Sequence, residues 1–454
     1  MSLSNISEKV KIMTEFKPLQ AWRYNPEKIA FGKVIAPPYD VISPQEQKKL
    51  YARSPFNCIR LILNREEPSD DALRNRYTRA RDFFQAWQRE GVLAREKEPC
   101  FYLYRQSFKD PRDGKVRKRF ALLGRLGLEP FEKGIVIPHE KTLAKPRQDR
   151  RKLLEMTHTN FSPVFGLYEE RKTHFLRLFL RLAKQKPLFD VADDEKVRHA
   201  LWGVKDGAAV RTIQKSLSRK KIYIADGHHR YQTALEYARD RHLEEEAASE
   251  SRKPFDYVLM ALVEFHDPGL VLLPTHRMLL PWPGFDPGAG LDSLNPFFDI
   301  QKCSLVSLQK KIKHPAREGE IAFGLVTAKG AFFLTLTGKE KARKAMLLNK
   351  PRVWYDLDVN ILSELVFKSC WKLPPDLWET SIQYTRSVKE AVTRVKKGEA
   401  TASFLLKPPR VESLQEMGKV RELMPQKSTY FYPKLASGLV FYHHDSVKGE
   451  PHGN

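Results

Sequence analysis

The segment Asp226-Gly227-His228-His229-Arg230 concentrates residue types that bind or transfer phosphate groups. It follows an apolar run and precedes a helical pattern, so it marks a turn from a strand into a helix. The first amide groups of a helix have no partner within the helix and lie at the positive end of its dipole. The glycine lets a ligand approach the backbone, the arginine offers a planar fork for an anion, and the imidazoles can donate or transfer protons.

The alternative is structural, because Asp-Gly is a common turn and the Asp226 side chain could cap the helix. We predict an anion site, since three cationic or donor residues repel the positive end of a helix unless an anion is bound there. Asp226, His228 and His229 are then candidate catalytic groups. Gly227, His228, His229 and Arg230 are candidate ligands of a phosphate or nucleotide.

A second candidate is the pair His139-Glu140, which ends a strand-like run and precedes a basic stretch containing Arg147 and Arg150. A carboxylate near a phosphate site can take the proton of a hydroxyl nucleophile. Glu140 is therefore a candidate general base with His139 beside it, and the two arginines are candidate substrate ligands. The alternative for Glu140 is a surface ion pair with a neighbouring lysine.

Lys427-Ser428-Thr429, followed by Lys434, combines ammonium and hydroxyl groups beside an aromatic segment. Such groups suit contacts with a phosphate or carboxylate. An edge strand protected by lysines is the equally weighted alternative.

Two shorter segments place polar residues beside prolines. Tyr39-Asp40 follows Pro-Pro, and His276-Arg277 ends an apolar strand. All four side chains are candidate substrate ligands, with an extended edge and a solvated turn as the respective alternatives.

The motifs of several other site types are missing from the sequence. The two adjacent histidines have poor spacing for one metal, and there is no His-x-x-x-His or Cys-x-x-Cys. No phosphate loop of the Gly-x-x-x-x-Gly-Lys type and no Gly-x-Ser-x-Gly elbow occurs. We predict no protein-held transition metal, and expect magnesium only as the partner of a bound nucleotide.

Composition sets the class of the protein. The 454 residues predict two or three domains, and 41% hydrophobic residues predict a globular fold. No apolar run approaches the ~20 residues needed to span a bilayer, and the first 16 residues lack a signal-peptide core. We expect a cytoplasmic protein without membrane contact.

The net charge of +24 would suit nucleic acid or an anionic ligand. The basic residues are spread over the chain, without a long basic tail or interleaved aromatics. Nucleic acid is therefore possible but not favoured, and the other interpretations are solvated basic faces and steering of anions into a cleft.

Strands and helices alternate irregularly, which predicts a mixed α/β or α+β fold. Three segments are expected: an N-terminal α/β segment at 1–115, a core at 116–280, and a C-terminal α/β segment at 281–454, with the Pro- and Gly-rich stretch 281–296 as linker. Expected strands lie at 57–64, 101–108, 118–127, 164–168, 199–205, 223–225, 257–263, 321–326, 330–336, 402–406 and 438–442; expected helices lie at 44–52, 71–90, 175–185, 208–217, 358–367, 388–397 and 411–423. The second and third strands are expected to form a hairpin around Asp113-Gly114, and Ser43 before Pro44 predicts the start of the first helix.

Five segments together resemble the bacterial and archaeal family called domain of unknown function 1015. The resemblance extends over nearly the whole chain. The segments are 36–42, 138–140, 225–231, 273–277 and 424–434.

The box at 226–230 is also similar to the phosphate-binding box of the ParB/sulfiredoxin-like superfamily, and within it to the free-serine kinases. That resemblance implies a ParB/sulfiredoxin-like core embedded in a larger mixed-sheet protein, with Glu140 as the base that activates a serine hydroxyl. About 85 residues separate Glu140 from Asp226, more than in those compact kinases. This spacing implies an insertion or a different fold around the same box.

The leading hypothesis is an enzyme that transfers a phosphoryl group from ATP or ADP, with magnesium, to a small hydroxylated metabolite. Lys427, Lys434, Arg147 and Arg277 would hold the acceptor's carboxylate or the outer phosphates. A non-catalytic nucleotide-binding switch of ParB-like type, associated with nucleic acid, is the second hypothesis. A phosphate-ester hydrolase that uses a histidine of the box is the third.

Overall fold

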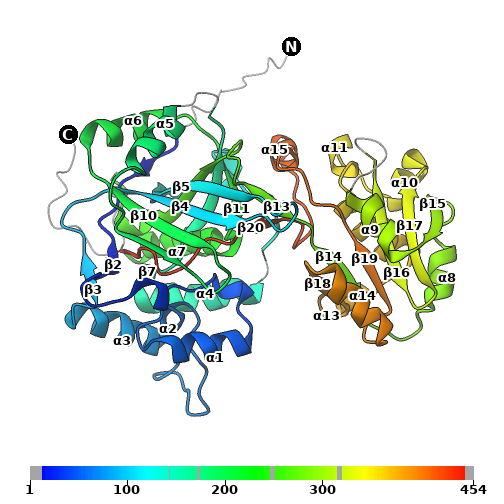
Figure 1. Ribbon diagram of the computed structural model, residues 1–454, viewed down its shortest axis with the longest axis horizontal. Coiled ribbons are helices and arrows are strands. Elements are labelled where there is room, and N and C mark those ends of the chain that lie inside the picture. Colours follow the sequence, from blue (N-terminus) through cyan, green and yellow to red (C-terminus); the bar gives the residue numbers. More distant parts are fainter. Residues whose placement is uncertain (1–12, 143, 171–173, 246–250, 314–319, 445–454) are drawn as a thin grey trace. The chain divides into compact units, whose positions relative to one another are not determined.

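The computed structural model describes residues 13–142, 144–170, 174–245, 251–313 and 320–444. The chain forms two compact units (Figure 1). Unit 1 comprises residues 1–138, 142–271 and 433–454, and unit 2 comprises 139–141 and 272–432. Both units mix strands and helices, which confirms the mixed α/β class.

Within the described part of unit 1, nine strands form one mixed sheet in the order β6-β11-β8-β12-β5-β4-β10-β9, with β1 paired to β5. Two strand pairs, β11–β6 and β12–β8, are parallel. Two small antiparallel pairs, β2–β3 and β7–β21, complete the unit. The strands are β1 Phe16–Lys17, β2 Trp22–Tyr24, β3 Leu93–Arg95, β4 Phe101–Lys109, β5 Val116–Gly127, β6 Val136–Ile137, β7 Thr159–Asn160, β8 Val164–Tyr168, β9 Phe189–Ala192, β10 Arg198–Val204, β11 Ile222–Asp226, β12 Tyr257–Glu264 and β21 Tyr442–His443.

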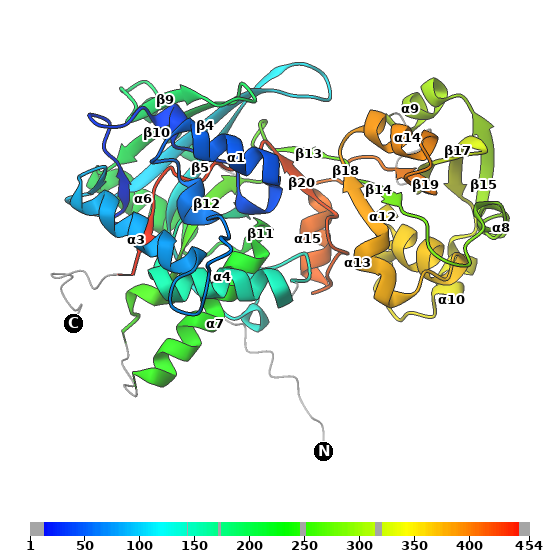
Figure 2. The ribbon, with the colours of Figure 1, turned by 90° about the horizontal axis from the view of Figure 1, so that it is seen from below.

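The hairpin expected around Asp113-Gly114 is confirmed, with Lys109 opposite Val116. Helices α5, α6 and α7 contribute apolar side chains to the same buried core as the sheet. Helices α4 and α7 pack side by side, as Figure 2 shows. The helices of unit 1 are α1 Pro44–Arg53, α2 Ile59–Ile62, α3 Arg76–Arg89, α4 Ala144–Thr157, α5 His174–Leu182, α6 Gly207–Leu217 and α7 His228–Glu244, with short 3-10 turns at Phe31–Lys33, Tyr39–Val41, Phe131–Lys133 and Pro254–Asp256.

In the described part of unit 2, six strands form an antiparallel sheet in the order β15-β17-β16-β19-β14-β18, and β13 pairs with β20. One core lies between this sheet and α11, α12 and η5, and another lies between the sheet and α9 and α14. The strands are β13 Val271–Leu273, β14 His276–Leu279, β15 Phe298–Cys303, β16 Ala322–Thr327, β17 Gly330–Leu336, β18 Ile382–Thr385, β19 Ala402–Leu405 and β20 Tyr430–Tyr432. The helices are α8 Pro287–Asp292, α9 Leu305–Lys313, α10 Lys339–Met346, α11 Arg352–Tyr355, α12 Asp358–Ile361, η5 Leu362–Cys370 (a π-helix), the 3-10 turn Pro375–Leu377, α13 Trp378–Ser381, α14 Val388–Lys396 and α15 Glu412–Lys419.

The strand expected at 57–64 is wrong, because the chain there forms the helical turn α2. The Asn57 carboxamide accepts from the Ile59 amide at 2.9 Å and starts the turn. Ile59, Leu61 and Ile62 are all buried, and periodicity cannot separate a short helix from a strand when both faces are covered.

Three further expectations differ in extent. The strand expected at 438–442 is reduced to β21, since Gly438 has a φ of +89°. The helix expected at 358–367 changes into η5 at Leu362, and that expected at 411–423 is limited to α15. The stretch 281–296 lies within unit 2, contains α8, and buries Trp282 in the core. No helix in the described parts of the chain has both the length and the apolarity that crossing a membrane requires.

Candidate functional site

The corner at Asp226 in unit 1 joins β11 directly to α7. A bulge interrupts the pairing of β11 with β8 between Ile224 and Asp226. Gly227 follows with a φ of +89° and is the N-cap residue of α7. Glycine adopts this conformation at little cost, so the chain can turn from strand to helix within one residue. The strand–turn–helix arrangement predicted from the sequence is confirmed.

The Asp226 carboxylate is held by two cations. The Lys434 ammonium lies 2.6 Å from Oδ1, and Arg230 Nη2 lies 3.1 Å from Oδ2. Burial by itself would raise the pKa of Asp226, but Lys434, Arg230 and His228 together hold it well below its usual range. The carboxylate is therefore ionised at physiological pH. No side chain among the described residues caps α7, so the capping alternative for Asp226 is not observed.

The Arg230 side chain folds back over Gly227. Its Nη1 donates to the Pro163 carbonyl. A Cβ atom placed on Gly227 would lie 2.9 Å from the guanidinium carbon, so only glycine leaves room for this conformation. The buried Nε of Arg230 has no hydrogen-bond partner among the described residues. This guanidinium thus keeps one donor for a further group.

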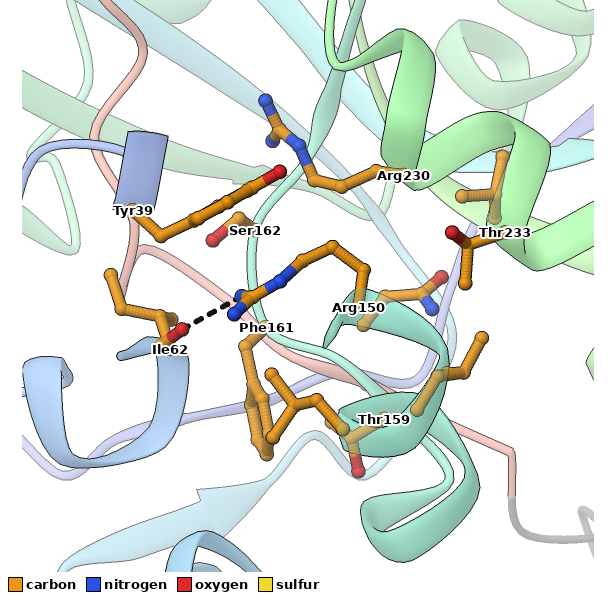
Figure 3. A pocket seen from close by; sticks show the side chains of 12 residues that line it. Tyr39, Ile62, Arg150, Thr159, Phe161, Ser162, Arg230 and Thr233 are labelled. Atoms are coloured by element: carbon orange, nitrogen blue, oxygen red, sulfur yellow. Dashed lines mark hydrogen bonds between the residues drawn. The ribbon is translucent and has the colours of Figure 1, made fainter. Parts of the chain in front are cut away.

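A cavity of about 50 Å³ lies beside this corner in unit 1. Figure 3 shows the Tyr39 ring between the side chains of Arg150 and Arg230. The Arg150 guanidinium carbon lies 3.8 Å from the centre of that ring, and its Nη1 donates to the Ile62 carbonyl at 2.7 Å. The hydroxyl groups in the lining come from Thr159, Ser162 and Thr233. The apolar groups come from Leu153, Leu154, Phe161 and Val258.

The groups in and behind the cavity carry excess positive charge. Arg150 pairs with Asp149, and Arg230 and Lys434 share Asp226. Three cations therefore face two carboxylates. Burial raises the pKa of Tyr39 to about 12, against the opposing effect of Arg150 and Arg230, so its hydroxyl stays protonated and can donate. This environment favours a bound anion.

The remaining candidates of unit 1 do not line this cavity. Asp40 is exposed, although it belongs to the same short turn as Tyr39. Arg147 on α4 pairs with Glu236 on α7 at 2.7 Å. His228 is buried and His229 is half-buried in the first turn of α7.

In unit 2 the segment from Lys427 to Thr429 packs against His139. His139 Nε2 lies 2.8 Å from the Thr429 hydroxyl, and its carbonyl accepts from the Met424 amide. The buried Ser428 hydroxyl donates to the Pro425 carbonyl at 2.5 Å. Lys427 has a φ of +57°, so it occupies the left-handed position of the turn. These contacts explain the turn structurally, and the ligand roles of Lys427, Ser428 and Thr429 stay predictions.

The two candidates on strand β14, His276 and Arg277, point to opposite faces of the sheet of unit 2, because successive side chains alternate along a strand. His276 Nδ1 accepts from the Leu406 amide, and burial lowers the pKa of His276 to about 4. Arg277 lies opposite Tyr384, with its guanidinium carbon 5.7 Å from the ring centre. The half-buried Glu140 carboxylate acts electrostatically on both Arg277 and Tyr384.

The candidates therefore fall into two groups, one in each unit. Tyr39, Arg150, Asp226, Arg230 and Lys434 meet in unit 1. In unit 2, Glu140 meets Arg277, and His139 meets Thr429.

Sequence reasoning missed several participants. Ser162, Thr159 and Thr233 belong to no motif, and only folding brings them to the cavity. Tyr384 and the buried Asp358, which both act electrostatically on Arg277, were equally unmarked, since they come from separate elements of unit 2. The described residues contain no group of three or more His, Cys, Asp or Glu side chains arranged to hold a metal ion.

A sequence profile described as "Protein of unknown function (DUF1015)" matches residues 16–360. The segment 424–434 lies outside the matched range. No curated protein matches the chain.

Several solved structures show weak likeness. A conserved hypothetical protein from Pyrococcus furiosus has 14% identity and a TM-score of 0.33, over 66% of this chain and 89% of its own. A free serine kinase in complex with AMP has 14% identity and a TM-score of 0.34, over 65% of this chain and 83% of its own. SbnI with C-terminal truncation, from Staphylococcus aureus, has 9% identity and a TM-score of 0.31, over 69% and 85%. TM-scores this low imply nothing about the site of this chain.

Proposed function

The chain belongs to the DUF1015 family of proteins of unknown function, and we propose that its unit 1 binds a phosphate group of a nucleotide at the cavity beside Asp226. The observation that carries the proposal is the convergence of Arg150, Arg230 and the Tyr39 hydroxyl on one cavity. Guanidinium groups are suited to phosphate because their donors match its oxygens in pairs. The positive end of the α7 dipole adds to the attraction.

The size of the cavity limits what it can enclose. At about 50 Å³ it is far smaller than the roughly 300–1,000 Å³ of pockets that enclose whole small molecules. It suits a single phosphate-sized group, with the rest of the ligand outside. Apolar walls from Phe161 and Val258 exclude water, which strengthens the attraction between the arginines and an anion.

We further propose that the bound nucleotide serves as a phosphoryl donor. An acceptor hydroxyl oxygen would attack phosphorus, the bond to the leaving phosphate oxygen would break, and the hydroxyl proton would pass to a base. Glu140 is the base implied by the sequence resemblance. It belongs to unit 2, so its role rests on that resemblance alone.

Magnesium would fit this corner only in part. Asp226 is ionised and firmly held, and each of its oxygens already accepts from one cation. It would supply one carboxylate, with phosphate oxygens and water completing the shell that magnesium prefers. The metal would neutralise charge on the transferred group.

Nucleotide binding to the full chain tests the proposal. We expect Arg230→Gln to weaken the binding of ATP or ADP at least tenfold in calorimetry, because it removes both a ligand of the phosphate and one of the two cations that hold Asp226. Arg239→Gln is the matched control, since Arg239 lies on the same helix but is 71% exposed and, among the described residues, pairs with the adjacent Asp240 alone. Equal affinity in the two variants, with both folded, would refute the phosphate site.

A separate experiment tests the phosphoryl-transfer step. Glu140→Gln should abolish phosphoryl transfer to a panel of small hydroxylated metabolites while leaving nucleotide affinity within twofold. Glu379→Gln is the control, because Glu379 is an exposed glutamate of unit 2. Full turnover in the Glu140→Gln variant would remove Glu140 from the mechanism without affecting the binding proposal.

A further inference from the structure

Helix α5 of unit 1 leaves part of its apolar stripe uncovered. Phe175 and Leu182 pack into the core of the unit, whereas Leu176 and Leu180 are 44% and 50% exposed. Residues four apart on a helix are neighbours, so the two leucines form one apolar ridge on the surface. The stretch 171–189, which contains this helix, has six Lys and Arg residues and no Asp or Glu.

The cations repeat with the same spacing beside this ridge. Arg177 and Arg181 each follow one of the two leucines, and Lys184 lies in the turn that ends the helix. All three side chains are exposed, and none forms an ion pair or a hydrogen bond within the described parts of the chain. On α7, by contrast, the Arg241 guanidinium pairs with two glutamates. We call the two exposed leucines and these three unpaired cations the α5 face.

A second basic segment lies near the start of α5. Arg219-Lys220-Lys221 follows α6, and α6 packs into the same core as α5 (Figure 1). Lys220 Nζ lies 3.4 Å from a carboxylate oxygen of Glu170, which precedes α5 by a few residues. Arg219 and Lys221 are exposed and have no ion-pair partner among the described residues. The positive charge therefore extends from the α5 face to the end of α6.

The combination of leucines and cations limits what the α5 face can contact. A second copy of the chain would bring like charges together, and the phosphates of a nucleic acid would leave the leucines in water. The surface of an anionic bilayer matches both features, because leucine enters the boundary between headgroups and acyl chains. The long Arg and Lys side chains reach from that depth back to the lipid headgroups.

We propose that the α5 face binds the surface of an anionic membrane, with Leu176 and Leu180 inserted at the interface and the cations paired with lipid headgroups. The contact is reversible, because two leucines bury little apolar area. Absence of an apolar run of spanning length led us to expect no membrane contact, but a helix in the plane of the interface needs no such run. The proposal is independent of the phosphate site beside Asp226.

Sedimentation of the full chain with lipid vesicles tests the proposal. The vesicles contain phosphatidylcholine alone, or phosphatidylcholine with about a third of phosphatidylglycerol, at physiological salt. Exposed charges are then screened beyond about 8 Å, which weakens non-specific attraction. We expect the chain to partition at least tenfold more strongly into the anionic vesicles. Equal partitioning into both kinds of vesicle, or into neither, would overturn the proposal and leave an acidic protein segment as the partner of this face.

Two double variants separate the contribution of charge from that of apolar contact. Arg177→Gln combined with Arg181→Gln should weaken binding to anionic vesicles at least tenfold, at roughly fivefold for each cation. Leu176→Ser combined with Leu180→Ser keeps every charge and should weaken binding at least about fivefold. Unchanged binding in the leucine variant would show that charge alone attracts the vesicles, and would refute insertion. All four positions are exposed, so both variants should fold.

Helix α7 of the same unit offers the matched control. Arg239 and Leu243 lie four residues apart on it and are 71% and 74% exposed. Arg239→Gln combined with Leu243→Ser should bind vesicles as the natural chain does. A loss equal to that of the α5 variants would mean that the attraction is spread over the whole surface.

Two further outcomes would assign the anion to another place. If the arginine double variant lost duplex DNA binding and kept vesicle binding, the α5 face would belong to nucleic acid. If Arg230→Gln lost vesicle binding, a lipid phosphate would be entering the cavity of unit 1 instead. We expect Arg230→Gln to keep vesicle binding and the arginine double variant to keep nucleotide affinity.

Discussion

At the scale of single residues, Gly227 serves two needs that no other residue type meets. Its φ of +89° lies in the left-handed region, and the place of a side chain is occupied by the Arg230 guanidinium. The arginine can then reach both Asp226 and the Pro163 carbonyl. The position of the Arg230 guanidinium in the candidate site thus depends on the absence of a Cβ atom at Gly227.

Gly227→Ala should therefore cost more than the backbone strain alone. Placing alanine in the left-handed region costs roughly 1–2 kcal/mol, and displacing Arg230 from Asp226 adds to that figure. We expect the free energy of unfolding, measured with urea, to fall by roughly 2 kcal/mol or more. Nucleotide binding should weaken as well.

Gly114→Ala supplies the comparison within the same unit. Gly114 has a φ of +74°, but its added Cβ would meet only the flexible Lys109 side chain, at 3.4 Å. The Gly114→Ala variant should lose the stability that the backbone strain costs and should bind nucleotide as tightly as the natural chain. Equal losses in both glycine variants would mean that the Arg230 contact contributes nothing.

At the scale of elements, β14 shows how one strand supports two different environments. Arg277 faces the core formed with α12, while His276 faces the other side and accepts from the Leu406 amide of the chain after β19. Burial, assisted by Arg277, lowers the pKa of His276 to about 4 from an ordinary value of 6.5. The strand is therefore sensitive to pH.

Unit 2 should lose stability as the pH falls from 6.5 towards 4. In this pH window His276 is protonated in the unfolded chain but stays neutral in the folded chain. Lowering the pH therefore favours unfolding. The expected loss is about 2 kcal/mol at pH 5. It can be measured as the difference in urea unfolding between pH 7 and pH 5.

His276→Asn should remove this component, because the asparagine oxygen can accept from the same amide and does not titrate. The control His266→Asn replaces a histidine of unit 1 that is 67% exposed, and it should leave the component assigned to His276 in place. An unaltered pH profile in His276→Asn would show that other groups cause the acid sensitivity.

At the scale of the whole molecule, the charge of +24 calls for an explanation that the two candidate sites do not supply. Many of the basic side chains form ion pairs on the surface, such as Arg151 with Glu155 and Arg241 with Glu245. Dispersed charge of this kind attracts polyanions without specificity, and such binding weakens steeply with salt.

We expect the chain to bind duplex DNA at 50 mM salt and to lose at least about a thousandfold in affinity by 200 mM, as non-specific binding through several phosphates does. Nucleotide affinity should fall far less, because one phosphate group bound at the cavity in unit 1 releases far fewer counterions than a row of duplex phosphates. Fluorescence anisotropy across salt concentrations measures both. Tight DNA binding at physiological salt would favour the nucleic-acid hypothesis instead.

The sequence by itself determined the local features. Ser43 before Pro44 marked the start of α1, Asp113-Gly114 marked the hairpin, and Gly227 marked the turn into α7. These features were predictable because they depend on interactions within a few residues. The short apolar run 57–64 was misassigned because burial on all sides removes the periodicity that separates strand from helix.

Only the tertiary structure decided which motifs meet. Lys434 lies 208 positions from Asp226 in the chain, yet their side chains are in contact, while Glu140 and Asp226 belong to different units. Nor could the sequence show that Arg277 and Asp358 are both buried, each with one terminal atom that has no hydrogen-bond partner among the described residues. The physical reason is that ion pairing and desolvation depend on distances and burial, which are set by the packing of whole elements, whereas caps and turns depend on neighbours in the chain.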